Sequence, residues 1–166
     1  MKANKKKNFN TYLKKFPEIT PPVTLTEDSP RAFSSYNESF NALMIAEFLL
    51  QSEDSEPDEF TEFIPCLKIP NTKDFYAVVY WKASLMNYQF ILVTYNKSGV
   101  LVDKAIIAGT SNQDGILVKS VASIDEDWII TIVSGAVEFQ QTDYDPKLSK
   151  AFSLEIMDGG KIISSE

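Results

Sequence analysis

The sequence predicts an α+β fold: an antiparallel β-meander of about eight strands, with one or two N-terminal helices packed on it. Three observations predict it. Apolar residues recur at helical spacing only before residue 52, eight runs rich in β-branched and aromatic residues follow from residue 62, and short polar connectors join those runs. Short connectors cannot form parallel crossovers, so consecutive strands are expected to pair antiparallel. Eight such strands make a strongly curved sheet or a partly open barrel.

The chain of 166 residues is expected to form one domain. Residues 1–8 are expected to be a disordered basic tail, and residues 9–166 a single globular domain. Within that domain we expect a helical part over residues 9–51, an acidic linker over residues 52–61 and the β-meander over residues 62–166.

Two segments of the helical part carry apolar residues at helical spacing. The first predicts a short helix that ends before Pro17, and its members, at positions i, i+3, i+4 and i+7, are Phe9, Tyr12, Leu13 and Phe16. The second predicts a helix over residues 36–51, because Ser35 and Glu38 have the spacing of a capping box and a broad apolar stripe follows them. Between the two helices, adjacent prolines predict an extended or irregular segment.

The eight predicted strands are separated by connectors that contain Asn, Asp and Gly, the residues that favour turns. The strands are EFIPCLKI, DFYAVVYWKA, YQFILVTY, VLVDKAIIAG, ILVKSVASI, DWIITIV, AFSLEIM and KIISS. In the second and third of them, both sets of alternating residues are apolar. We therefore expect these central strands to be covered on both faces of the sheet.

Charge is distributed unevenly along the chain. Six of the sixteen Lys and Arg residues lie in the first fifteen positions, which hold no acid, so the remaining residues carry ten bases and 23 acids, a formal charge of −13. A body of that sign repels nucleic acid and anionic membranes and attracts basic proteins. We therefore expect a basic protein partner and no nucleic acid.

The residue types of the chain exclude several common chemistries. The sequence contains no His and a single Cys, Cys66, so it cannot build His-dependent nucleophile systems, His-based metal sites or thiolate clusters. It also lacks the glycine-rich loops that cradle phosphates and an EF-hand loop with its glycine. We expect no catalytic residue, no cofactor and no metal site, and therefore a protein that is not an enzyme.

Two groups of acids leave a carboxylate-based hydrolase open as an alternative. Asp125, Glu126 and Asp127 lie in one predicted turn, and Asp143 and Asp145 lie in another loop. A glycosidase-type mechanism requires two carboxylates a few ångströms apart, and nothing in the sequence brings these two segments together. Solvated turns, in which Asp bonds to its own backbone, account for both groups.

The leading functional prediction is a non-enzymatic, acidic protein-binding domain, of which an immunity or inhibitor protein that blocks a basic enzyme is one concrete form. The linker SEDSEPDEF is the most acidic stretch of the chain, and Tyr and Trp are the residue types that anchor interfaces. The residues predicted to bind the partner are Glu53, Asp54, Glu56, Asp58, Glu59, Tyr76, Tyr80 and Trp81. The other alternative is a carrier whose barrel-like sheet encloses a small apolar ligand.

Two features bear on where the protein works. The chain has no apolar run long enough to span a membrane, and its lysine-rich start lacks the apolar stretch of a signal peptide. We therefore expect a cytoplasmic protein, or an exported one if the native precursor is longer than this chain.

Overall fold

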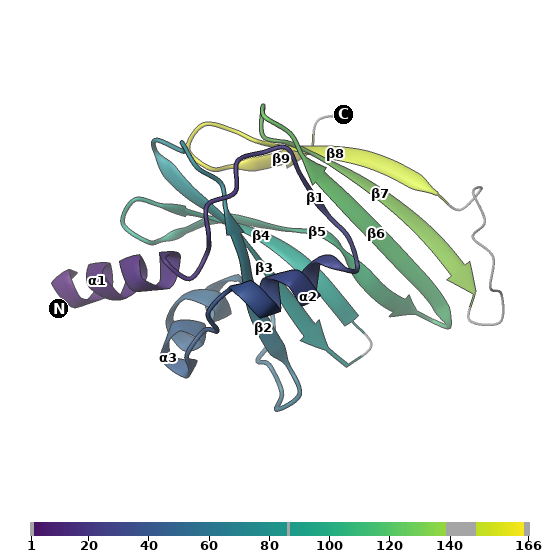
Figure 1. Ribbon diagram of the computed structural model, residues 1–166, viewed down its shortest axis with the longest axis horizontal. Coiled ribbons are helices and arrows are strands. Elements are labelled where there is room, and N and C mark those ends of the chain that lie inside the picture. Colours follow the sequence, from purple (N-terminus) through teal and green to yellow (C-terminus); the bar gives the residue numbers. More distant parts are fainter. Residues whose placement is uncertain (1, 86, 139–148, 165–166) are drawn as a thin grey trace.

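The computed structural model describes residues 2–85, 87–138 and 149–164. Nine strands within these ranges form a single sheet (Figure 1). They are β1 (Val23–Leu25), β2 (Glu62–Lys68), β3 (Phe75–Ser84), β4 (Asn87–Asn96), β5 (Leu101–Gln113), β6 (Ile116–Ile124), β7 (Ile129–Glu138), β8 (Lys150–Ile156) and β9 (Ile162–Ser164). Strands β2 to β9 are neighbours in chain order and pair antiparallel, which confirms the predicted α+β fold and its meander.

The sheet is strongly curved but is not closed into a barrel. Side-chain hydrogen bonds join its C-terminal end to the middle of the meander. The hydroxyl of Thr94 on β4 donates to the carbonyl of Gly160 (2.6 Å), and the amide of Ile162 on β9 donates to Asp103 on β5 (2.9 Å). The hairpin of β8 and β9 is therefore joined to β4 and β5 by single hydrogen bonds and does not form a β-ladder with either strand.

Strand β1 lies inside the proline-rich segment that was expected to be extended or irregular. It pairs antiparallel with the second half of β6, with Val23 opposite Ile124 and Leu25 opposite Ala122. That half of β6 is available because β5 pairs with β6 only through residues 109–113. Strands β5 and β6 separate beyond that point, and the proline-rich segment supplies the missing neighbour for β6.

The helices differ from the prediction in their bounds. They are α1 (Lys2–Leu13), α2 (Ser29–Tyr36) and α3 (Ala42–Met44), which continues as a π-helical turn η1 (Ile45–Leu49) and a 3-10 turn η2 (Leu50–Ser52). Helix α1 begins at Lys2, so the expected disordered tail over residues 1–8 is wrong for residues 2–8. Lys5, Lys6 and Lys7 lie on the outside of a helix whose apolar side is buried.

The second predicted helix, over residues 36–51, begins later than expected, at Ala42, and its predicted capping box is wrong. Ser35 lies inside α2, where its hydroxyl donates to the carbonyl of Arg31 (3.0 Å), and the side chain of Asn41 accepts from the amide of Met44 to cap α3. Asn37 is extended, and its side-chain amide donates to the carbonyl of Pro65 on β2 (2.7 Å). This bond to the sheet fixes a break between α2 and α3 that the apolar spacing does not reveal.

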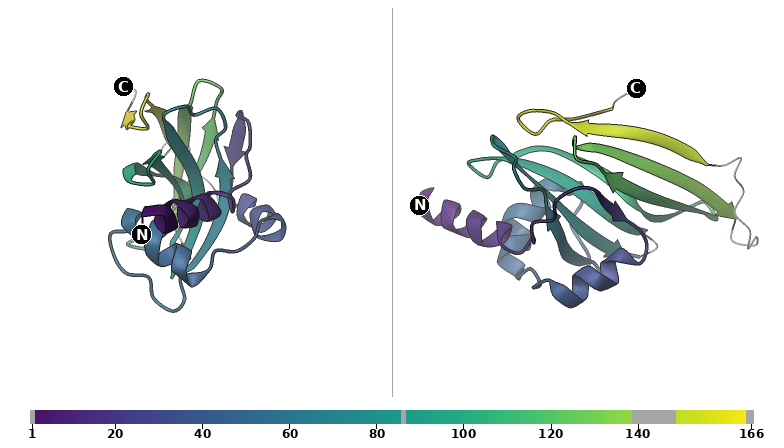
Figure 2. Two further views of the ribbon diagram at one scale, coloured as in Figure 1. Left: turned by 90° about the vertical axis from the view of Figure 1, so that its left-hand side faces the viewer. Right: turned by 45° about the horizontal axis from the view of Figure 1, so that its top comes forward.

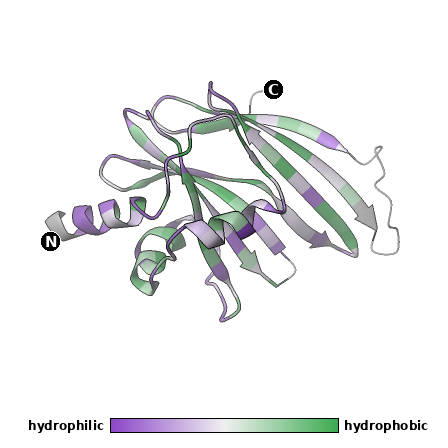
Figure 3. Cartoon of the chain, viewed as in Figure 1, coloured by the Kyte–Doolittle hydropathy of each residue, from purple (hydrophilic) through white to green (hydrophobic). Residues whose placement is uncertain are grey.

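The central strands are covered on both faces, as the sequence predicts. Helix α2 lies on the opposite side of β2–β4 from α1 and α3 (Figure 2). On β3, Phe75, Ala77 and Val79 belong to the core under α2 and β1, whereas Val78 and Tyr80 belong to the core under α1 and α3. The apolar colour of these strands in Figure 3 reflects this two-sided burial.

Candidate functional site

The acidic run, residues 53–59 of the linker, begins with a carboxylate that is buried and paired rather than solvated. The side chain of Glu53 is only 4% exposed and forms an ion pair with Lys82 on β3. The hydroxyl of Tyr80 donates to its other oxygen (2.7 Å). Glu53 and Tyr80 were both expected to bind a partner, and in the folded protein they bind each other instead.

The rest of the acidic run is exposed but differs in its pairing. Asp54 accepts a hydrogen bond from Lys104 Nζ on β5 (2.7 Å), and this bond and the lysine charge lower the pKa of its carboxyl group. Asp58 accepts bonds from the Phe60 amide and the Thr61 hydroxyl, which close a local turn. The carboxylates of three residues, Glu56, Asp58 and Glu59, are exposed and form no ion pair with the residues that the structure describes.

Three tyrosine hydroxyls are buried together under α1 and α3. Tyr95 donates to the carbonyl of Phe48 (3.2 Å), so Tyr12, whose hydroxyl lies 2.9 Å from that of Tyr95, is the donor within this pair. Tyr80 lies in the same core, 2.8 Å from the hydroxyl of Ser52. Burial raises the pKa of each of these tyrosines well above the ordinary value. The network fastens the π-helical turn to the sheet.

We expect this network to make the protein sensitive to alkali. In the unfolded chain these tyrosines titrate near pKa of about 10, whereas the native state keeps their protons to higher pH. The contribution of these protonated tyrosines to the free energy of unfolding is therefore fully present below about pH 10. Above that pH it falls by about 1.4 kcal/mol per pH unit for each buried tyrosine. Urea unfolding between pH 8 and 11 measures this slope. In Tyr80→Phe the slope should be shallower than in the wild type, and equal slopes would contradict the prediction.

The remaining two aromatic residues of the prediction lie on opposite faces of β3. Tyr76 is half-buried against Phe9, and Lys97 Nζ lies 4.0 Å from the centre of its ring, so its accessible face is already occupied. Trp81 lies on the other face and stacks on Tyr88 of β4, with ring centres 5.9 Å apart and planes 5° apart. Trp81 is half-buried and Tyr88 is 46% exposed, so this pair presents aromatic surface to solvent.

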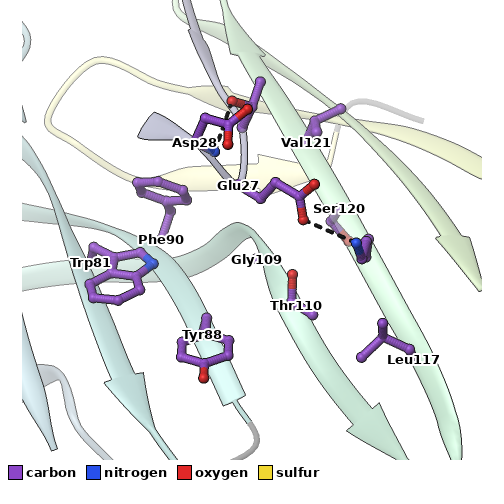
Figure 4. A pocket seen from close by; sticks show the side chains of 12 residues that line it. Glu27, Asp28, Trp81, Tyr88, Phe90, Gly109, Thr110, Leu117, Ser120 and Val121 are labelled. Atoms are coloured by element: carbon purple, nitrogen blue, oxygen red, sulfur yellow. Dashed lines mark hydrogen bonds and ion pairs between the residues drawn. The ribbon is translucent and has the colours of Figure 1, made fainter. Parts of the chain in front are cut away.

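The stacked pair forms one side of a groove of about 620 Å³, which we call the aromatic groove (Figure 4). Strands β3 and β4 supply its aromatic side, β5 and β6 the opposite side, and the loop between β1 and α2 its end. The lining residues are Thr26, Glu27, Asp28, Trp81, Tyr88, Phe90, Gly109, Thr110, Leu117, Lys119, Ser120 and Val121. Most of this lining is apolar or aromatic, and the charged groups lie on the loop and on β6.

The strand register places Glu62, which follows the acidic run, in line with the groove. Residues directly opposite each other in antiparallel strands point to the same face of the sheet. One such row runs across the sheet through Glu62, Ala83, Tyr88, Thr110 and Lys119. Neighbouring strands are about 4.8 Å apart, which places the exposed Glu62 roughly 10 Å from Tyr88.

Two carboxylates at the end of the groove differ in whether they are neutralised. Glu27 forms an ion pair with Lys119 Nζ on β6 (3.1 Å), shown as a dashed line in Figure 4. The side chain of Asp28 is exposed and forms neither an ion pair nor a hydrogen bond with the described part of the chain. Asp28 therefore leaves an uncompensated negative charge at the end of the groove.

Asp125 and Cys66, two residues with groups that could take part in catalysis, are held in local contacts or buried. Asp125 accepts from the amides of Asp127 and Ile129, so its carboxylate holds its own turn. Asp143 and Asp145 lie outside the described residues. Burial raises the pKa of the Cys66 thiol, which keeps it protonated and inert as a nucleophile. No group of three or more Cys, Asp and Glu residues within the described ranges could hold a metal ion.

Comparison with known proteins returned no matching family model, no matching curated protein and no matching solved structure. In the described ranges, the helices are all too short or too polar to cross a membrane.

Proposed function

We propose that the protein is a non-enzymatic binding protein that docks a basic protein partner at the aromatic groove. The observation that carries this proposal is a groove that is lined both by the half-exposed Trp81–Tyr88 stack and by the unpaired carboxylate of Asp28. A Lys or Arg side chain laid on this stack would gain a cation–π interaction with the rings and an ion pair with the carboxylate. Trp and Tyr are also the residue types that most often dominate the energy of protein interfaces.

The exposed acids of the run add a second, longer-range contribution. Glu56, Asp58 and Glu59 precede Glu62, which shares a row with Tyr88. Unpaired charges at the rim of an interface chiefly speed the encounter with a partner of opposite sign and make it depend on salt. An inhibitor that uses the groove to block a basic enzyme is the form of this function that fits both contributions.

A small apolar ligand is the second candidate, and the size of the groove favours it. Ligand pockets usually measure about 300–1,000 Å³ and are lined mainly by apolar and aromatic side chains. The aromatic groove, at about 620 Å³ and with Phe90, Leu117 and Val121 in its lining, is of that kind. The two candidates differ in whether the bound group must carry a positive charge.

Trp81 itself provides the test, because the chain has only one other tryptophan. Trp128 packs on Phe75 away from the groove, so the variant Trp128→Phe keeps an aromatic ring there and leaves Trp81 as the single fluorescent reporter. This variant is titrated with a capped peptide that carries four Arg residues, and in parallel with the same peptide carrying neutral citrulline in place of Arg. We expect the Trp81 emission to respond to the Arg peptide alone.

Substitutions then locate the binding. In the Trp128→Phe background, Asp28→Asn should weaken binding of the Arg peptide by about threefold to tenfold, because it removes one charge-assisted hydrogen bond. Asp158→Asn makes the same change in the exposed turn between β8 and β9 and should leave the affinity unchanged. Equal responses to the Arg and citrulline peptides would favour the apolar-ligand alternative, and no response to either would overturn the groove as a binding site.

A further inference from the structure

The outer face of α1 is a lysine stripe that no other part of the described chain neutralises. Its members line one shallow hollow of about 430 Å³ and are Lys6, Lys7, Asn10, Thr11 and Lys14. All are exposed, and none of the three lysines forms an ion pair with the described residues. In Figure 3 the visible side of α1 is the polar colour, in contrast to the strands beside it.

The lysine stripe cannot reach the aromatic groove of its own chain. Phe9, Tyr12 and Leu13 on the other side of α1 are buried in the core under α1 and α3, which fixes the helix in place. Figure 1 and Figure 2 both show α1 extending away from the sheet, at the opposite end from the loop that joins β1 to α2. The chain therefore carries a basic surface and a groove for a basic group at two separate places.

We propose that the lysine stripe of one copy of this protein docks at the aromatic groove of a second copy. This inference rests on the proposed function, because it names one basic partner that the groove would accept. Charge complementarity supports a second copy as the occupant. The stripe carries three unpaired lysines, whereas the groove carries the unpaired carboxylate of Asp28, and the exposed Glu62 lies in the same strand row as Tyr88. Lys stems can lie across the Trp81–Tyr88 rings while their ammonium groups reach Asp28 and Glu62.

The geometry of this contact predicts open-ended assembly. The stripe and the groove are different surfaces, so each copy can donate its stripe to one neighbour and its groove to another, and such head-to-tail contacts form chains unless they close into a ring. Exposed charges contribute most of the attraction. It should therefore weaken as the Debye length falls from about 10 Å at 0.1 M salt to about 3 Å at 1 M.

Light scattering after size exclusion tests the inference with the full chain. At low salt the average mass should rise with concentration above the monomer mass of 18.7 kDa, and in 1 M NaCl it should return to that value. A stripe variant carries Lys6→Gln, Lys7→Gln and Lys14→Gln. A groove variant carries Asp28→Asn and Glu62→Gln. All five side chains are exposed, so circular dichroism should show both variants folded.

Mixing the two variants gives the decisive result. Each variant alone lacks one half of every contact and should stay at the monomer mass. In an equimolar mixture, the intact stripe of the groove variant can dock at the intact groove of the stripe variant. The mixture should therefore form dimers of twice the monomer mass. Assembly that persists in either variant alone, or a mixture that stays monomeric, would overturn the inference. A wild-type protein that binds the Arg peptide yet never self-associates would overturn it while leaving the proposed function standing.

Discussion

Replacing Gly109 with Ala is expected to lower the free energy of unfolding by about 4 kcal/mol, near the upper end for a single substitution. Gly109 lies on β5 with φ of +143°, a region in which side chains are strained. A Cβ atom there would lie 2.0 Å from the carbonyl oxygen of Tyr88 on β4. That atom belongs to the backbone, so the clash is relieved only if β4 and β5 move apart, and the aromatic groove changes shape with them.

Gly115 provides the matched control. It also has a positive φ, +83°, but a Cβ atom added there would have no atom within 4 Å. Gly115→Ala should therefore incur only the left-handed backbone strain, about 1–2 kcal/mol. Urea unfolding of both variants measures the difference. Equal losses of stability would show that the close approach of Tyr88 to β5 is not what requires glycine at position 109.

Glu53→Ala is expected to lower the free energy of unfolding by about 3 kcal/mol, because removing one member of a buried ion pair leaves the other uncompensated. The side chain of Lys82 is 18% exposed, so it regains only part of its hydration. The hydroxyl of Tyr80 loses its carboxylate acceptor as well. The segment from η1 to the acidic run should then loosen, since Glu53 ties its end to β3.

Glu56→Ala serves as the control, because its side chain is exposed and forms no ion pair with the described residues. Its effect on the free energy of unfolding should stay within about 0.5 kcal/mol. Combining Glu53→Ala with Lys82→Met completes a double-mutant cycle, in which the double variant should be more stable than the sum of the two single losses predicts. Additive losses would mean that the two groups do not interact.

The strands could be predicted because their signal is local. The alternation within runs such as FYAVVYWK determines which residues share a face of the sheet. In the structure, the alternate residues of β3 and β4 are buried in two separate cores, one on each face. The break between α2 and α3 could not be predicted in the same way. It depends on bonds from Asn37 to the carbonyls of Pro65 and Cys66, which are almost thirty residues away in the sequence.

The candidate site could be predicted only in part, for the same reason. The acidic run was visible as composition, but Lys82 and Lys104, which pair with its first two acids, come from strands far along the chain. Trp81 was among the residues predicted to bind the partner, whereas Tyr88 was not, because their stacking follows from the register of β3 with β4. Asp28 reaches the groove only because β1 joins β6, and nothing in the sequence near residue 28 signals that pairing.

The measurement that tests the central claim most directly is a nuclear magnetic resonance titration of the isotope-labelled wild-type protein with the four-Arg peptide. The indole of Trp81 and the amides of Asp28, Tyr88 and Thr110 should shift together and saturate with one dissociation constant, while the indole of Trp128 stays in place. The citrulline peptide should leave all of them unchanged. Shifts confined to Glu56, Asp58 and Glu59, with Trp81 and Tyr88 unaffected, would contradict the assignment of the aromatic groove as the binding site.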